Sequence, residues 1–236
     1  MNSLPSDQTA VETTAYEGEI QLVFSQVYLL MTLGLVITAI VAAWVSTSEA
    51  MLRLIFSSPW VPLGLFVVQL ILVITLTAAI TRLSTGVAVA LFIAYAALLG
   101  ITLSTIFIAY TDASIATTFL VTAGTFGVMS IFGFVTKRDL TKMGSLLIML
   151  LLGFLLGTLL NIFLRSSTLY WILTYVGIAI FVGLIAYDTQ KIKRMAAGGL
   201  AAGRQRGGIV VMGALALYLD FINLFLLLLR IFGRSR

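Results

Sequence analysis

The stretch that decides the fold is GALALYLDFINLFLLLLR, residues 213–230. Apart from Asp220 and the closing Arg230 it carries no charge, and it approaches the roughly 20 apolar residues that cross a bilayer's hydrocarbon core. An ionisable group at the centre of a membrane helix costs about 2.5–3.5 kcal/mol on insertion scales. A carboxyl group retained at that cost indicates a partner or a water-filled cavity inside a helix bundle.

The remainder of the chain has the same apolar character. Of its 236 residues, 61% are hydrophobic and 10% are charged, whereas soluble domains have about 45–50% and about 25%. A soluble enzyme, a coiled coil and a disordered chain are therefore excluded. We predict an all-α, polytopic membrane protein with seven transmembrane helices. The predicted spans are 24–45, 61–81, 87–109, 114–135, 145–164, 170–188 and 209–231.

The chain ends and one long link differ from these spans in composition. Residues 1–23 form a polar, acidic tail, and because a signal peptide begins with basic residues, we expect this tail to lead into an uncleaved first span. The transmembrane domain covers 24–231, and 232–236 is a short basic tail. The link 189–208 is rich in Gly, Ala and basic residues, which predicts a flexible loop unless 189–195 continue the sixth helix.

The distribution of basic residues predicts the orientation in the membrane. Nine lie on the side of the N-terminus and five on the other, which predicts a cytoplasmic N-terminus, although the terminal Arg-Ser-Arg argues the other way. The nine are Arg82, Lys137, Arg138, Lys142, Lys191, Lys193, Arg194, Arg204 and Arg206, and the five are Arg53, Arg165, Arg230, Arg234 and Arg236. Because these bases form no single patch, we expect the lipid bilayer rather than nucleic acid as a partner.

Two missing residue types restrict the chemistry. The chain has no Cys and no His, so it has no thiolate nucleophile, no thiolate or imidazole metal ligand and no imidazole base. A serine triad, a Ser–His dyad and a zinc protease each lose an essential part. We predict that the chain is not an enzyme and binds no cofactor tightly. Proton chemistry must come from its acids, bases and tyrosines.

Two of the nine acids do not lie where water would solvate them. Asp188 ends the sixth predicted span, in GLIAYDTQKIK (183–193), and Asp220 lies near the middle of the seventh. Helical spacing aligns Gly213, Ala216, Asp220 and Asn223 on one small or polar stripe. For Asp220 a functional role is favoured over a structural hydrogen bond, whereas for Asp188 the two interpretations are balanced.

Paired carboxyl groups on adjacent spans suit a proton- or cation-handling site. Two carboxyls close together in a low dielectric do not both ionise easily, so they would share a proton and titrate as a unit. Once ionised, they would attract a hard cation such as calcium. Calcium takes six to eight oxygen ligands, and two carboxylates supply too few for tight storage. We therefore expect weak, transient calcium binding at Asp188 and Asp220 during permeation.

Two other membrane functions fit less well. Intramembrane aspartyl proteases also use aspartates on neighbouring spans, with a Tyr-Asp pair like Tyr187-Asp188. Their second aspartate lies in Gly-x-Gly-Asp, followed by a Pro-Ala-Leu segment, whereas here it follows Leu217-Tyr218-Leu219 and all three prolines precede the third span. A retinal protein needs a lysine within the last span, and the four lysines here lie in links.

Four segments carry specific motifs: GITLSTIFIAYT (100–111), FGVMSIFGFVTKRDLTKMGS (126–145), GLIAYDTQKIK (183–193) and GALALYLDFINLFLLLLR (213–230). Together they resemble the Bax inhibitor family, and more narrowly its bacterial transmembrane Bax inhibitor motif branch. The resemblance implies a bacterial inner membrane protein whose last helix is central, enclosed by the other six. It also implies a pH-sensitive calcium leak gated by an aspartate pair, here Asp188 and Asp220, with Asn223 as a candidate lining residue.

The same resemblance implies a closing salt bridge and a second class of function. An arginine of the second span pairs with the sixth-span aspartate in the closed state, and Arg82 is the base at that place here. Some bacterial relatives bind and restrain a membrane-anchored AAA protease, which would make the chain an interaction protein. The predicted spans also place Asp188 nearer the interface than Asp220, so contact between them requires the sixth helix to extend inward or the seventh to begin below the surface.

Overall fold

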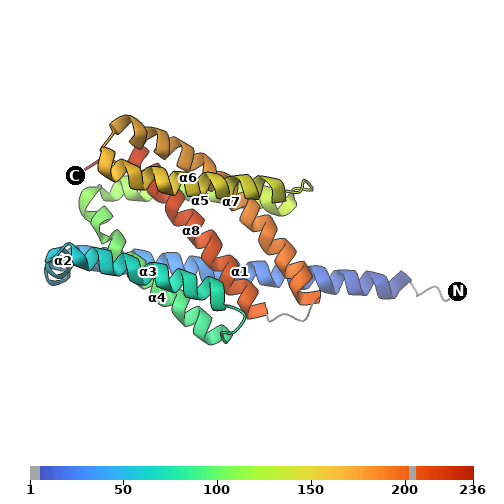
Figure 1. Ribbon diagram of the computed structural model, residues 1–236. Coiled ribbons are helices and arrows are strands. Elements are labelled where there is room, and N and C mark those ends of the chain that lie inside the picture. Colours follow the sequence, from blue (N-terminus) through green and yellow to red (C-terminus); the bar gives the residue numbers. More distant parts are fainter. Residues whose placement is uncertain (1–5, 202–205) are drawn as a thin grey trace.

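The computed structural model describes residues 6–201 and 206–236, and these fold into helices connected by short links (Figure 1). The helices are α1 (Ser6–Thr47), α2 (Glu49–Phe56), α3 (Trp60–Ala79), α4 (Thr85–Ala109), α5 (Asp112–Val135), α6 (Thr141–Leu164), α7 (Ser167–Ala201) and α8 (Arg206–Phe232). Seven of them are long and apolar enough to cross a membrane, which confirms the predicted number. The exception is the short α2, which Ser48 caps at its N-terminus.

Two helices extend well beyond their predicted spans. The first begins at Ser6 rather than near residue 24. The seventh continues to Ala201, which confirms that 189–195 continue the helix of the sixth predicted span. The prediction of a flexible loop is wrong for 196–201 and for 206–208, which begin α8. Residues 202–205 lie outside the described residues. Lys, Arg, Met and Ala all favour helix, and the extension is packed as well, because Ile192 and Ala196 are buried.

The last helix is the centre of the bundle, as the resemblance implied. In its most apolar stretch 72% of the residues are buried, against at most 39% in any other spanning helix. Figure 1 shows α8 crossing obliquely between one group formed by α1, α3 and α4 and another formed by α5, α6 and α7. It packs against α1, α4, α5 and α7, while α3 packs chiefly on α4 and α6 chiefly on α7.

Glycines allow the helices around α8 to approach closely. A Cβ on Gly133 of α5 would overlap the backbone carbonyl of Ala186 on α7, and a Cβ on Gly144 of α6 would overlap the ring of Tyr187. On α8, a Cβ on Gly213 would lie 3.1 Å from side-chain atoms of Ile192 and Val27. Small residues at such contacts are the usual means by which membrane helices associate.

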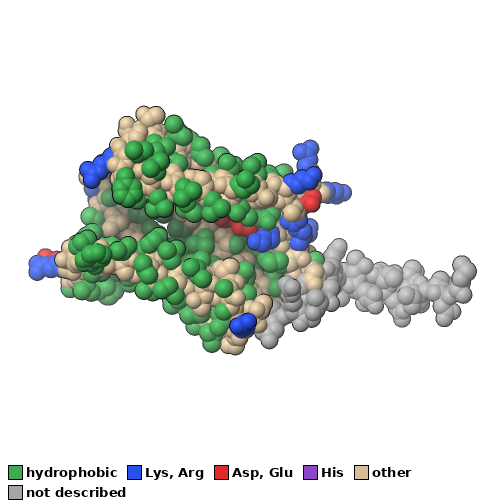
Figure 2. Space-filling view, viewed as in Figure 1, with side chains coloured by type: hydrophobic (Ala, Val, Ile, Leu, Met, Phe, Trp, Pro, Cys, Tyr) green, Lys and Arg blue, Asp and Glu red, His purple; other side chains and the backbone are tan. Residues whose placement is uncertain are grey.

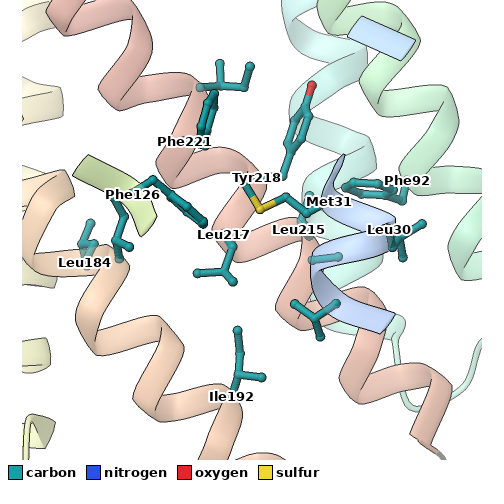
Figure 3. Close-up of a cluster of buried hydrophobic side chains, with 14 of the residues drawn as sticks. Leu30, Met31, Phe92, Phe126, Leu184, Ile192, Leu215, Leu217, Tyr218 and Phe221 are labelled. Atoms are coloured by element: carbon teal, nitrogen blue, oxygen red, sulfur yellow. The ribbon is translucent and has the colours of Figure 1, made fainter. Parts of the chain in front are cut away.

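A buried polar node attaches α8 to α1 and α4. The Tyr218 hydroxyl lies 2.6 Å from Thr38 Oγ1, and Thr38 Oγ1 is also 2.9 Å from the carbonyl oxygens of Gly34 and Ala96. Figure 3 shows Tyr218 on α8 beside Phe92 of α4, and the two rings are T-shaped with centroids 5.4 Å apart. These contacts give hydrogen-bond partners to two hydroxyl groups that would find no water inside the membrane.

The C-terminal segment attaches the far end of α8 to the α4–α5 connection. The Thr111 amide donates to the Arg234 carbonyl and the Arg236 amide donates to the Ala109 carbonyl, each at 3.1 Å. The chain end is therefore fixed on the side of the bundle opposite the N-terminus (Figure 1).

Substituting two glycines of α5 tests the close α5–α7 contact. Gly→Ala inside a helix normally stabilises by up to about 1 kcal/mol, and the Cβ of Gly124→Ala meets no atom within 4 Å. We expect Gly124→Ala to keep or raise the melting temperature of the purified protein. Gly133→Ala should lower it, because overpacking costs about 1–3 kcal/mol. Equal melting temperatures for the two variants would contradict this packing.

Candidate functional site: a carboxyl pair between α7 and α8

Asp220 is enclosed by the bundle at the middle of α8. Its side chain is buried with 5% relative exposure, and its Oδ2 atom has no hydrogen-bond partner among the described residues. The helix that carries it is continuous from Arg206 to Phe232, so Asp220 lies about 20 Å from either end at 1.5 Å per residue. A carboxyl group at this depth has no access to the interface and depends on its neighbours within the protein.

Asp188 is the neighbour that meets it. The two carboxyl groups lie within hydrogen-bonding distance of each other. The long α7 makes this contact possible, because Asp188 precedes the end of that helix at Ala201 by thirteen residues, or about 20 Å. The inward extension that the sequence required is thus present, and it brings Asp188 level with Asp220.

Lys191 is a charged residue at this site that the sequence analysis missed. It follows Asp188 by three residues, a spacing that places two side chains on neighbouring positions of a helix surface. Its charge acts on both carboxyl groups, and its Nζ lies 5.9 Å from the centre of the Tyr187 ring. The i,i+3 spacing from Asp188 was the available signal.

Two other predicted residues do not join the pair. Arg82 is exposed in the turn between α3 and α4, and it forms no ion pair within the described part of the chain. The Asn223 amide donates to the carbonyl of Leu219, 2.8 Å away on its own helix, and so is not directed at either carboxyl. The closing salt bridge to Arg82 and the lining role of Asn223 stay predictions.

The two carboxyl side chains differ in their exposure. Figure 2 shows a hollow in the surface between the two helix groups, and acidic atoms are visible there. Asp188 is partly exposed, whereas Asp220 is buried. Among the described residues, no cluster of three or more acidic, His or Cys side chains could hold a metal ion. The site thus offers two carboxyl groups, one partly exposed and one buried.

Gln190 fixes the α5–α6 link to the helix that carries Asp188. This buried side chain accepts a hydrogen bond from the Leu140 amide at 2.9 Å and donates one to the Arg138 carbonyl at 2.8 Å. Sequence reasoning did not single out Gln190, since an amide that bonds only backbone leaves no pattern of partner side chains. Through it, the link 136–140 and the Asp188 segment of α7 form one unit.

Asp139 in that link is an acid of a different kind. Hydrogen bonds from Thr141, together with the charge of Arg194, lower the pKa of Asp139 below the ordinary 3.8, and its Oδ1 lies 2.9 Å from the Arg194 guanidinium. A carboxyl group with a lowered pKa contributes its favourable interactions above the unfolded pKa and loses them as pH falls through the folded value. Asp139 therefore stays ionised throughout pH 5–8.

The sequence of this chain is similar to those of known proteins. The family model described as inhibitor of apoptosis-promoting Bax1 matches residues 20–236. A protein of Escherichia coli (strain K12) described as inner membrane protein YbhL is 49% identical over the full length of both chains. Two uncharacterized proteins are each 43% identical to this chain. The match to the protein from Borreliella burgdorferi covers 90% of this chain and 91% of the relative, and the match to the protein from Deinococcus radiodurans covers 92% of both.

Removing the Gln190 side chain should release the α5–α6 link. Each hydrogen bond contributes about 0.5–1.5 kcal/mol, so we expect the Leu140 amide in Gln190→Ala to exchange with deuterium at least about fivefold faster. Thr189→Ala is the control, because the Thr189 hydroxyl bonds the Ile185 carbonyl within α7 and leaves the link untouched. Unchanged exchange at Leu140 in Gln190→Ala would show that the link is held by other contacts.

Proposed function

The chain belongs to the Bax inhibitor family and is a multi-pass inner membrane protein, and within that family we propose that it acts as a pH-sensitive calcium leak. The gate is the pair Asp188 and Asp220, which share one proton. The observation that carries this proposal is the contact between the two carboxyl groups at the middle of the bundle.

The pair is suited to switching by protons. Two carboxyl groups in contact titrate together, because ionisation of one opposes ionisation of the other. With one shared proton the pair carries a single negative charge and holds α7 against α8. Loss of that proton replaces the hydrogen bond by repulsion between two carboxylates. The charge and the spacing of the two helices then change in the same step.

Calcium is the cation that this chemistry favours. Calcium is a hard ion that takes carboxylate and carbonyl oxygens, and the pair supplies carboxylate oxygens, with the side chain of Asp188 partly exposed. Two carboxylates are far fewer than the six to eight oxygens of a storage site. An ion held this weakly is released readily, as conduction requires.

The pH response falls to this pair because few other groups are suited to it. The chain has no His, and the lowered pKa of Asp139 removes that residue from the pH 5–8 range. The charged groups that act on the pair are the two aspartates themselves and Lys191 of α7. We therefore assign the pH dependence to Asp188 and Asp220, with Lys191 adjusting the pH at which they switch.

Calcium flux into liposomes that carry the purified protein tests the proposal. We expect the initial rate of wild-type protein to change across a scan from pH 5 to 8, because loss of the shared proton changes the charge of the pair. The double variant Asp188→Asn/Asp220→Asn keeps the shape of both side chains and removes their ionisation, so its rate should be independent of pH.

Asp139→Asn is the matched control, because it removes an exposed acid on the α5–α6 link and should keep the wild-type pH profile. Size-exclusion profiles and melting temperatures establish that all three proteins are folded. If wild type and the double variant leak alike at every pH, the carboxyl pair is not the gate.

Deletion of residues 2–19 distinguishes a calcium leak from the other class of function, the binding of a membrane-anchored protease. The deletion should abolish protease binding if the chain is an interaction protein, and it should leave a calcium leak unchanged.

A further inference from the structure

An opening lies between α1 and α5, where these helices pass on either side of α8. It contains two adjoining cavities of about 300 and 470 Å³, which share Tyr28 and Phe126 in their walls. The walls are almost wholly apolar. They include Phe24 and Met31 from α1, Phe119 and Phe134 from α5, and Phe221 from α8. We call this feature the α1–α5 groove.

The groove follows the two helices across much of the membrane. Its lining begins at Phe24 and Phe134 near the basic end of the bundle and continues to Ala39 and Phe119. Fifteen residues of each helix span these points, or about 22 Å. One leaflet of hydrocarbon is about 15 Å, half of the 30 Å core, so the groove is longer than one leaflet is deep.

Side chains of three helices form the floor of the groove. In Figure 3, Phe126 of α5 and Met31 of α1 point toward the same space beside Leu217 of α8. The ring centroids of Phe126 and Phe221 are 5.5 Å apart in a T-shaped arrangement. This contact separates the groove from the interior of the bundle and makes its floor apolar.

A lysine marks the basic end of the groove. The Lys193 ammonium of α7 donates to the Phe134 carbonyl at 2.9 Å and lies 4.5 Å from the centre of the Phe134 ring, and that ring lines the groove. An ammonium has three donors, so two remain after this bond. The exposed Lys137 and Arg138 follow Phe134 on the chain. Figure 2 shows basic side chains gathered at this end of the molecule.

We propose that the α1–α5 groove binds an anionic phospholipid, with an acyl chain between α1 and α5 and the phosphate on the Lys193 ammonium. Basic pockets between transmembrane helices are the sites where anionic headgroups bind. The groove adds an apolar channel that continues from such a pocket into the hydrocarbon core. This inference requires the membrane-embedded fold and is independent of the calcium leak.

The charge at one end of the groove selects an anionic lipid over a helix from a second copy. The Lys193 ammonium lies at the Phe134 end of an apolar channel that continues to Phe119. An anionic phospholipid carries both the phosphate that the ammonium would hold and the acyl chain that the channel would hold.

The absence of cysteine from the chain allows a direct test. Gly127→Cys places a bimane label in the groove, and Gly124→Cys places the same label on α5 outside it; a Cβ at either glycine meets no atom within 4 Å. Each labelled protein is reconstituted with phosphatidylglycerol or phosphatidylcholine that carries a nitroxide on its acyl chain. We expect half-maximal quenching of the label at 127 at a share of labelled phosphatidylglycerol in the membrane about fivefold lower than that of labelled phosphatidylcholine. One lysine near an anionic headgroup provides a preference of this size.

Charge variants decide whether Lys193 is the headgroup site. Lys193→Gln should abolish the preference at position 127 and Lys193→Arg should keep it, while Lys142→Gln, at the same end of the bundle, should leave it unchanged. The label at 124 should be quenched equally by both lipids. Equal quenching at 127, or a preference that survives Lys193→Gln, would overturn the proposal. Disulfide-linked dimers through Cys at position 127 would also overturn it, because they would place a second copy in the groove.

Discussion

The structure depends on one constraint, which is that the carboxyl group of Asp220 lies at the middle of a membrane-spanning helix. Lipid provides no partner for such a group, and its exposure there would cost about 2.5–3.5 kcal/mol or more. The helix that carries it must therefore be surrounded by protein. Burial of α8 on several sides by α1, α4, α5 and α7 satisfies that requirement. The remaining membrane-spanning helices, α3 and α6, then cover the layer that encloses α8.

Enclosing one helix within so small a protein requires short distances between backbones. Gly133 and Gly144 let α5 and α6 approach α7, and this in turn presses α7 against α8 so that Asp188 reaches Asp220. The polar node at Thr38 and Tyr218 fixes α8 against α1 and α4 from the other direction. The carboxyl contact is thus a result of packing on both sides of α8.

The sequence predicted those parts of the fold that depend on composition along a single helix. The seven spans follow from apolar length, and they are confirmed. Asp220 in the run 213–230 predicted burial of that face inside the bundle, and this residue is buried. The central position of the last helix was implied by the family resemblance and is confirmed as well. The far end of α7 was not predictable in this way, because Gly and basic residues at 196–208 resemble a loop when their packing is unknown. The burial of Ile192 and the bonds of Gln190 to the 136–140 link hold this segment as a helix. Gln190 acts through contacts between distant segments, which composition does not reveal. The i,i+3 spacing of Lys191 from Asp188 was present in the sequence, but its action on Asp220 depends on the packing of α7 against α8.

One segment of α7 contributes to both the carboxyl pair and the α1–α5 groove. Asp188, Gln190 and Lys193 lie within six consecutive residues, yet at 100° per residue they point in different directions. Asp188 meets Asp220, Gln190 holds the α5–α6 link, and Lys193 reaches the end of the α1–α5 groove at Phe134. A helix that is hydrogen-bonded throughout moves as a rigid body over so short a length. Any rotation or shift of α7 that separates the two carboxyl groups must therefore also strain the 136–140 link and displace Lys193 from Phe134. The stabilities of these three contacts are thus coupled.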